Sequence, residues 1–290
     1  MSRRTAAAPP ARPTTPWPWL DRGGRFSPFR LSVLIGLCCP ALVLVWLLAT
    51  GQMGAEPWKE ATRDAGAHAI HVLLLSLFVT PLRWIADWPK ALTFRRMVGL
   101  AALAYVLLHL TIYSGDLAWN LLAVVSEIAT RVYLTLGFGV LVGLSVLGWT
   151  STDGSQRRLG PKWKKIHRWV YVLAALAVLH AFLQSKSRAD DAVLAAGFYL
   201  WLMGWRLLSG RWRADPWALL ALSVAVFAAT VGLEFVWYAT ASRLPAARIA
   251  EANLGFDAGI RPAQWVLLAG LSVAMIPWLR RLARRSPRPA

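Results

Sequence analysis

The sequence predicts an all-α, multi-pass transmembrane helical bundle of about eight spans. Of its 290 residues, 57% are hydrophobic and only 16% are charged, whereas soluble domains average about 25% charged residues. Mean hydropathy is +0.47 and Trp occurs 17 times. Disordered chains are poor in aromatic residues and rich in charge, so this composition excludes that class as well. A multi-pass membrane protein is the class that remains.

Eight apolar runs approach the roughly 20 residues that cross a bilayer at about 1.5 Å per residue. They are Leu31–Thr50, Gly66–Leu82, Met97–Gly115, Val132–Ser151, Trp169–Ser185, Ala192–Trp205, Pro216–Leu233 and Pro262–Leu279. The sixth run is the shortest, and it spans if Arg206 snorkels to the interface and Leu207 and Leu208 complete the helix. Residues 1–30 are rich in Pro and Arg, and we expect a disordered basic cytoplasmic tail there.

Basic residues alternate across these runs in the way that the positive-inside rule requires. With the N-terminus inside and eight spans, 24 of the 32 Lys and Arg residues fall in cytoplasmic segments. An odd number of spans would break this alternation. We therefore expect a multi-pass membrane protein with both termini cytoplasmic.

Neither the net charge of +18 nor the two cysteines indicates another class. The cations recur in short groups between apolar runs, so no nucleic-acid partner is expected. Cys38 and Cys39 are adjacent within an apolar run and are interpreted as small packing residues. No disulfide framework or cysteine-based metal site is expected.

The five histidines, all in or beside predicted spans, are the strongest candidates for chemistry, because ionisable groups within a membrane are costly and usually functional. His109 lies 12 residues after Met97, a rise of about 18 Å. His180 lies 13 residues after His167, a rise of about 20 Å. Both imidazoles therefore lie at a similar depth, in the outer half of the bilayer. Facing histidines at one depth are what bis-histidine haem ligation requires, although a neutral imidazole bonded to a neighbouring helix is the alternative.

Small residues on the third and fourth spans provide room for a macrocycle between helices. Gly99 and Ala102 lie on the third span, and Gly139 and Gly143 form a small-xxx-small pattern on the fourth. Plain helix–helix packing explains the same pattern equally well.

Three other polar residues within the spans have open roles. His68 and His71 are three residues apart and share a helix face. They could ligate a metal, relay protons or hold a structural bond. Glu234 lies near the outer end of the seventh span, where exposure at the membrane interface is the simplest explanation.

Several short motifs in this order resemble the MsrQ family, also called YedZ, the haem-binding membrane subunit of a periplasmic methionine sulfoxide reductase system. They are Gly54-Ala-Glu-Pro57, Thr80-Pro-Leu82, Arg95-Arg-Met-Val-Gly-Leu100, Leu108-His-Leu-Thr111, Glu127-Ile-Ala-Thr-Arg131, Tyr133-Leu-Thr-Leu-Gly137, Thr150-Ser-Thr152, Arg158-Leu-Gly160 and Ile166-His-Arg-Trp-Val-Tyr171, followed by His180. The resemblance covers residues 31–208. Residues 209–290 form a C-terminal extension with two further transmembrane helices and no assigned role.

The resemblance implies a ferric-reductase-like transmembrane domain with b-type haem and FMN, in the bacterial inner (cytoplasmic) membrane. It implies that electrons pass from the respiratory quinone pool to MsrP, a soluble periplasmic molybdopterin enzyme that reduces oxidised methionines in proteins. The haem-associated histidines of the family fall on His109, His167 and His180. His68 and His71 have no counterpart in it.

One departure from two-haem relatives concerns the inner end of the bundle. The position expected for a second histidine on the third span holds Arg95 or Arg96, so His167 has no obvious histidine partner. His167 is therefore a candidate for a second haem, for flavin or for a haem propionate. Arg158 and Lys162, in the basic loop after the fourth span, either fix orientation against anionic lipid or hold the FMN phosphate.

These observations favour an electron-transfer subunit that has no substrate chemistry of its own. The alternatives are a transporter whose histidines serve a proton or solute pathway, and a stand-alone quinone or metal reductase of the same fold. Outer-loop acids offer a weakly acidic docking face for the partner: Glu56, Glu60, Asp64, Asp116 and Glu127.

Overall fold

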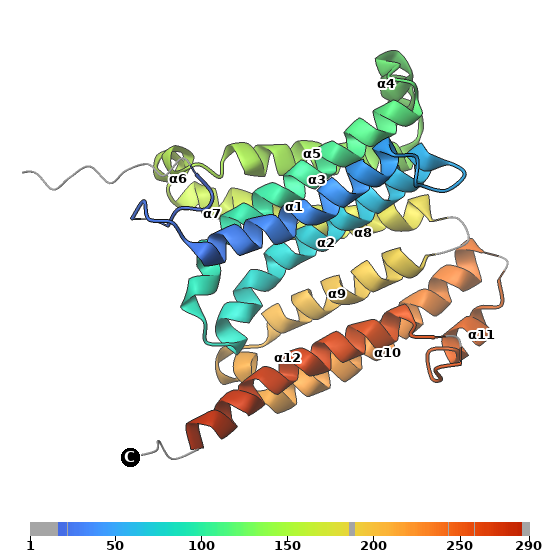
Figure 1. The fold of residues 1–290 in the computed structure, drawn as a ribbon. Helices are drawn as coiled ribbons and strands as arrows, with labels where there is room; N and C mark the ends of the chain where they lie inside the picture. The colour runs from blue at the N-terminus through green and yellow to red at the C-terminus, as the bar shows by residue number, and fades with distance from the viewer. Residues whose placement is uncertain (1–16, 22, 186–188, 243, 258, 286–290) are drawn as a thin grey trace, which may run out of the picture.

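The computed structural model describes residues 17–285 apart from 22, 186–188, 243 and 258. It is 82% helical, with no strand among the described residues. The long helices lie side by side in one bundle (Figure 1). The predicted all-α, multi-pass architecture is confirmed.

In the described part of the chain, eight long helices form the bundle and short helices connect them. The long helices are α1 (Pro28–Ala49), α2 (Pro57–Ile85), α3 (Arg95–Asp116), α5 (Val132–Trp149), α8 (Trp169–Gln184), α9 (Asp190–Leu207), α10 (Pro216–Ala241) and α12 (Pro262–Arg285). The connecting helices are η1 (Pro89–Thr93), α4 (Leu121–Thr130), α6 (Asp153–Leu159), α7 (Pro161–His167), η2 (Gly210–Ala214) and α11 (Ala246–Glu251).

Seven helices in the described part of the chain are long and apolar enough to cross a membrane, with α7 and α8 counted together. The sixth expected span, α9, lies outside this set. Its 18 residues include Asp190, Asp191 and Arg206, which lower its hydropathy. The helix nevertheless runs along the bundle beside its neighbours (Figure 1).

The described part of the expected N-terminal tail contains a local turn. Residues 1–16 lie outside the described residues, but the segment before α1 forms a tight turn closed by a bridge between Leu20 and Phe26. The Asp21 carboxylate accepts hydrogen bonds from the amides of Gly23 and Arg25. These bonds hold the pKa of Asp21 below its usual value. An Asx-type turn therefore precedes α1.

The two ends of the bundle differ in the connections they carry. One end carries η1, α6, α7 and η2, which hold the Arg- and Lys-rich loops; we call it the basic end. The opposite end, called the far end, carries α4 and α11 (Figure 1).

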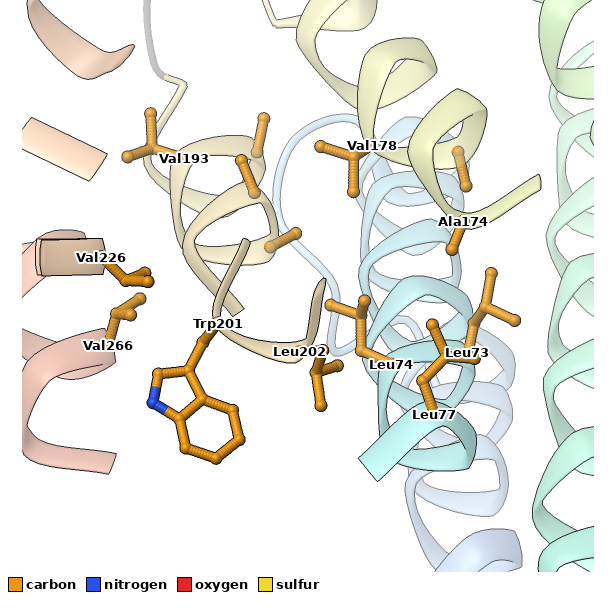
Figure 2. Packing of buried hydrophobic residues seen from close by; sticks show 14 of the residues in the cluster. Leu73, Leu74, Leu77, Ala174, Val178, Val193, Trp201, Leu202, Val226 and Val266 are labelled. Atoms are coloured by element: carbon orange, nitrogen blue, oxygen red, sulfur yellow. The ribbon is translucent and has the colours of Figure 1, made fainter. Parts of the chain in front are cut away.

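Helix α9 forms the centre of the hydrophobic core. It packs against α2, α8, α10 and α12. Figure 2 shows Val226 and Val266 on one side of α9 and residues of α2 and α8 on the other. The close approach of α12 depends on Gly197, since a Cβ there would lie 2.5 Å from Cγ2 of Val266. Small residues that let helices approach closely are typical of membrane bundles.

Arg206, the cation that shortened the sixth apolar run, has a specific place in this core. Pro81 lacks an N–H, so the carbonyl of Leu77 four residues earlier loses its helical donor. A guanidinium nitrogen of Arg206 donates to this carbonyl at 2.8 Å. Its charge lies 4.8 Å from the ring centre of Tyr171. Arg206 therefore completes the hydrogen bonding of α2 rather than only extending to the interface.

Replacing Arg206 with Met should lower the stability of the folded protein by about 1–3 kcal/mol, the cost of an unpaired buried carbonyl. Pro81→Ala supplies the missing N–H, so the same Arg206 replacement should cost less in a Pro81→Ala background. Thermal unfolding of the four proteins in detergent measures this coupling. Arg211→Met is the matched control, because Arg211 is exposed and stacks on Trp212. Equal losses in both backgrounds would exclude this role.

Candidate functional site

The structure brings His109 and His180 together from two helices that are far apart in sequence. His109 lies on α3 and His180 on α8. Their ring centroids are 6.4 Å apart and their planes are nearly perpendicular, at 83°. The two rings therefore share one depth in the bundle, as their spacing in the sequence predicts.

Both imidazoles are oriented in the same way by a backbone carbonyl. Nδ1 of His109 lies 2.8 Å from the carbonyl oxygen of Thr62, and Nδ1 of His180 lies 2.7 Å from that of Tyr133. Because a carbonyl only accepts, each Nδ1 carries the hydrogen and each Nε2 keeps a free lone pair. Such an N–H to carbonyl bond is the usual support of a metal-binding histidine.

The separation of the rings fits two ligands of one metal ion. A metal–nitrogen bond of about 2 Å on each side, plus about 1 Å from each nitrogen to its ring centre, gives centroids about 6 Å apart. Among the described residues no group of three or more His, Cys, Asp or Glu side chains could hold a metal. Two protein ligands suit a haem, whose macrocycle supplies the remaining iron ligands.

A glycine of the neighbouring helix lies against each ring. A Cβ on Gly66 of α2 would lie 3.1 Å from Nδ1 and Cε1 of His109. A Cβ on Gly137 of α5 would lie 2.8 Å from Cε1 of His180. By contrast, Gly139 faces open space, and Gly143 packs against Leu173 of α8. Gly143 therefore serves helix packing, and the residues that make room for the rings are Gly66 and Gly137.

The two halves of the site repeat at one interval. Gly137, Tyr133 and His180 each lie 71 residues after their counterparts Gly66, Thr62 and His109. The α2–α3 pair and the α5–α8 pair therefore present equivalent halves of the site.

The same interval relates His167 to Arg96, so the basic end has no matching histidine pair. The Arg96 guanidinium pairs with Asp153. Nε2 of His167 lies 3.1 Å from the hydroxyl of Thr150, and its ring stacks on Trp163 with centroids 4.0 Å apart. Two axial histidines for a second haem are therefore not brought together at His167 in the described part of the chain.

The two cations predicted to hold an anionic group lie on the short helices of the basic end. Arg158 lies on α6 and Lys162 on α7, and both side chains are exposed. Neither is within salt-bridge distance of an acid among the described residues.

The other two histidines, His68 and His71, both lie on α2. His68 bonds through Nδ1 to the carbonyl of Asp64 in its own helix, and its ring stacks on Tyr105 with centroids 5.9 Å apart. The Tyr105 hydroxyl in turn bridges α3 to α1, because it donates to the carbonyl of Leu37. His68 therefore fits the structural-bond interpretation, whereas His71 has an exposed side chain on α2.

The interpretation of Glu234 as an interfacial residue was wrong. Its side chain is 0% exposed and pairs with Arg261. The amide of Asn253 donates to its other oxygen at 2.7 Å. Periodicity gave no sign of these partners, because both lie in the connection between α11 and α12.

Sequence reasoning also missed Gly66 and Gly137 as parts of the site. A signal was present, since each glycine precedes its histidine by 43 residues. A repeated interval between a glycine and a histidine carries little weight until the structure shows the two residues in contact.

Comparison with known protein families identifies one domain. Residues 65–178 match the family described as ferric reductase like transmembrane component. The match begins next to Gly66, includes His109 and His167, and ends two residues before His180. A ferric reductase-like transmembrane domain is therefore present, which points to electron transfer in a membrane. No solved structure matches the chain.

Proposed function

We propose that this protein is the membrane electron-transfer subunit of a methionine sulfoxide reductase system and carries b-type haem between His109 and His180. The observation that carries the proposal is the pair of imidazoles whose ring centroids lie 6.4 Å apart, each with Nδ1 bonded to a carbonyl. The ferric reductase-like domain supports it, and the resemblance to MsrQ narrows it to one family of partners.

Haem iron, when bound, takes up and releases single electrons. The protein's own contribution is to hold both imidazoles in one tautomer, each directing Nε2 away from its carbonyl. Helices α2 and α5 supply those carbonyls. The bundle thus presents two oriented ligands on rigid helices, which suits electron transfer without a substrate site.

The position of the site along the bundle supports delivery of electrons at the far end. His180 lies four residues before the end of α8 at Gln184, and His109 lies seven before the end of α3 at Asp116. These rises are about 6 Å and about 10 Å. The positive-inside rule assigns the basic end to the cytoplasm and the far end to the periplasm. We propose the bacterial inner membrane and an outward electron path on this basis.

The proposed donor and acceptor follow from the resemblance: the respiratory quinone pool and a periplasmic MsrP-type enzyme. Two of the five acids of the expected docking face, Glu56 and Glu127, pair with neighbouring cations. Glu127 pairs with Arg131 and accepts from the Tyr113 hydroxyl. Glu56 pairs with Lys59. Nearness of His109 and His180 to the far end, rather than net acidity, is therefore the structural support for a partner there.

The basic end supports an FMN site at Arg158 and Lys162, since both are exposed and free of acidic partners among the described residues. Replacing both with Gln should lower the flavin content of the purified protein at least severalfold, because charge-assisted bonds to the phosphate are lost. Flavin fluorescence after extraction measures this, with haem absorbance as the internal control. Unchanged flavin content would leave these residues only an orienting role.

The function is tested with the purified full-length protein in three steps. A Soret band that shifts on reduction separates the haem protein from the transporter alternative. Reduction of the haem by a quinol tests the donor. The third step measures reoxidation of the haem. Reoxidation when an MsrP-type enzyme and a methionine sulfoxide peptide are added together, and not when the peptide is added alone, separates an electron-transfer subunit from a stand-alone reductase. A chain that lacks haem would overturn the proposal.

A further inference from the structure

We propose that Gly66 and Gly137 are positioning residues that set the orientation and the electron-donating strength of the two histidine ligands. The inference rests on the proposed haem site. It assigns a role in that site to two residues that carry no functional group.

Each glycine lies where a side chain would collide with an imidazole. A Cβ on Gly137 would lie 2.8 Å from Cε1, 3.0 Å from Nδ1 and 3.3 Å from Nε2 of His180. A Cβ on Gly66 would lie 3.1 Å from Cε1 and Nδ1 of His109. Separations below 3.0 Å require a shift of one partner, whereas 3.1 Å requires only a small one. The two positions therefore differ in severity.

The glycines also give access to the carbonyls that orient the rings. In an α-helix the carbonyl of residue i accepts from the amide of residue i+4. The carbonyl of Thr62 is thus paired with the amide of Gly66, and that of Tyr133 with the amide of Gly137. Each imidazole approaches its carbonyl over the turn that ends at the glycine, and a Cβ there would obstruct this approach.

The arrangement occurs twice, at one interval of 71 residues and in two different pairs of helices. Two other glycines of these helices do not share it. A Cβ on Gly99 of α3 or on Gly139 of α5 would meet nothing within 4 Å. Contact with an imidazole therefore distinguishes Gly66 and Gly137 from these two glycines.

Loss of the carbonyl bond has a predictable electronic consequence. A hydrogen bond from Nδ1 to a carbonyl fixes the tautomer and makes Nε2 a stronger base. A stronger base stabilises ferric iron relative to ferrous iron. Displacing the ring by a methyl group should therefore weaken ligation and make the midpoint potential of the remaining haem more positive.

The experiment compares Gly137→Ala and Gly66→Ala with the controls Gly139→Ala and Gly99→Ala in the full-length protein. Haem per inserted protein, the low-spin electron paramagnetic resonance signal and the midpoint potential are measured. Alanine favours helix more than glycine does, so helix propensity alone cannot reduce haem content in any variant. We expect the largest loss in Gly137→Ala, at least severalfold, and a more positive potential in Gly66→Ala. Both controls should match the wild type.

The outcomes separate this inference from the proposed function. Wild-type protein without haem would overturn the haem site itself. Wild-type protein with haem, together with Gly137→Ala and Gly66→Ala proteins indistinguishable from their controls in signal and potential, would overturn only the role of the glycines. If Gly137→Ala fails to insert in the membrane, Gly66→Ala decides the question, because its milder contact leaves the fold intact.

Discussion

Replacing either His109 or His180 with alanine should abolish the low-spin haem of the purified protein, with at least a tenfold loss of the reducible Soret band per inserted chain. The two imidazoles come together from α3 and α8 with ring centroids 6.4 Å apart, and each has its Nδ1 bonded to a carbonyl. Removing one opens the coordination of the iron and removes half of the protein's attachment to it. Electron transfer to a partner should fall with the haem content.

The remaining histidines provide matched controls for this prediction. His68→Ala removes a ring that stacks on Tyr105, and His71→Ala removes an exposed ring of the same helix. Both variants should keep the haem. His167→Ala should also keep it, because its ring contacts Trp163 and Thr150 instead of another imidazole. Full low-spin haem in His109→Ala or His180→Ala would refute the pairing.

The depth of His109 and His180 could be predicted from sequence because helical rise converts residue number into distance along the helix axis. Which side of each helix faces the other could not, because the rotation depends on packing against several neighbours. Gly66 and Gly137 illustrate the limit: their function lies in what a Cβ would touch, and the residues touched are 43 positions away.

The partners of ionisable residues in the spans were the least predictable part of the fold, because they too depend on packing between helices that are far apart in sequence. Arg206 was expected to extend to the interface, and it donates instead to the carbonyl that Pro81 leaves without a helical donor, 129 residues earlier in the sequence. Hydropathy records the cost of a charge in a membrane but not the partner that offsets it. The short helices α4 and α11 were missed because they are too short to span a bilayer.

Replacing Glu234 with alanine should destabilise the protein by about 3–5 kcal/mol, the cost of removing one partner of a buried ion pair. Glu234 is fully buried, and its pair with Arg261 is supported by the amide of Asn253. Arg261 also lies 3.4 Å from Asp190 at the start of α9. The change would leave the largely buried guanidinium with the partly exposed Asp190 carboxylate as its remaining partner, so the connection between α11 and α12 should loosen from α9.

Thermal unfolding in detergent measures this effect, and Glu251→Ala is the matched control because Glu251 is an exposed acid at the end of α11. The control should unfold like the wild type. Haem content at low temperature should be unchanged in Glu234→Ala, since both histidines and both orienting carbonyls lie on α2, α3, α5 and α8. Lower stability of Glu234→Ala with unchanged haem content would show that α10 and α12 stabilise α9 without forming the site. Equal stability of Glu234→Ala and Glu251→Ala would show instead that Asp190 alone holds Arg261 in place.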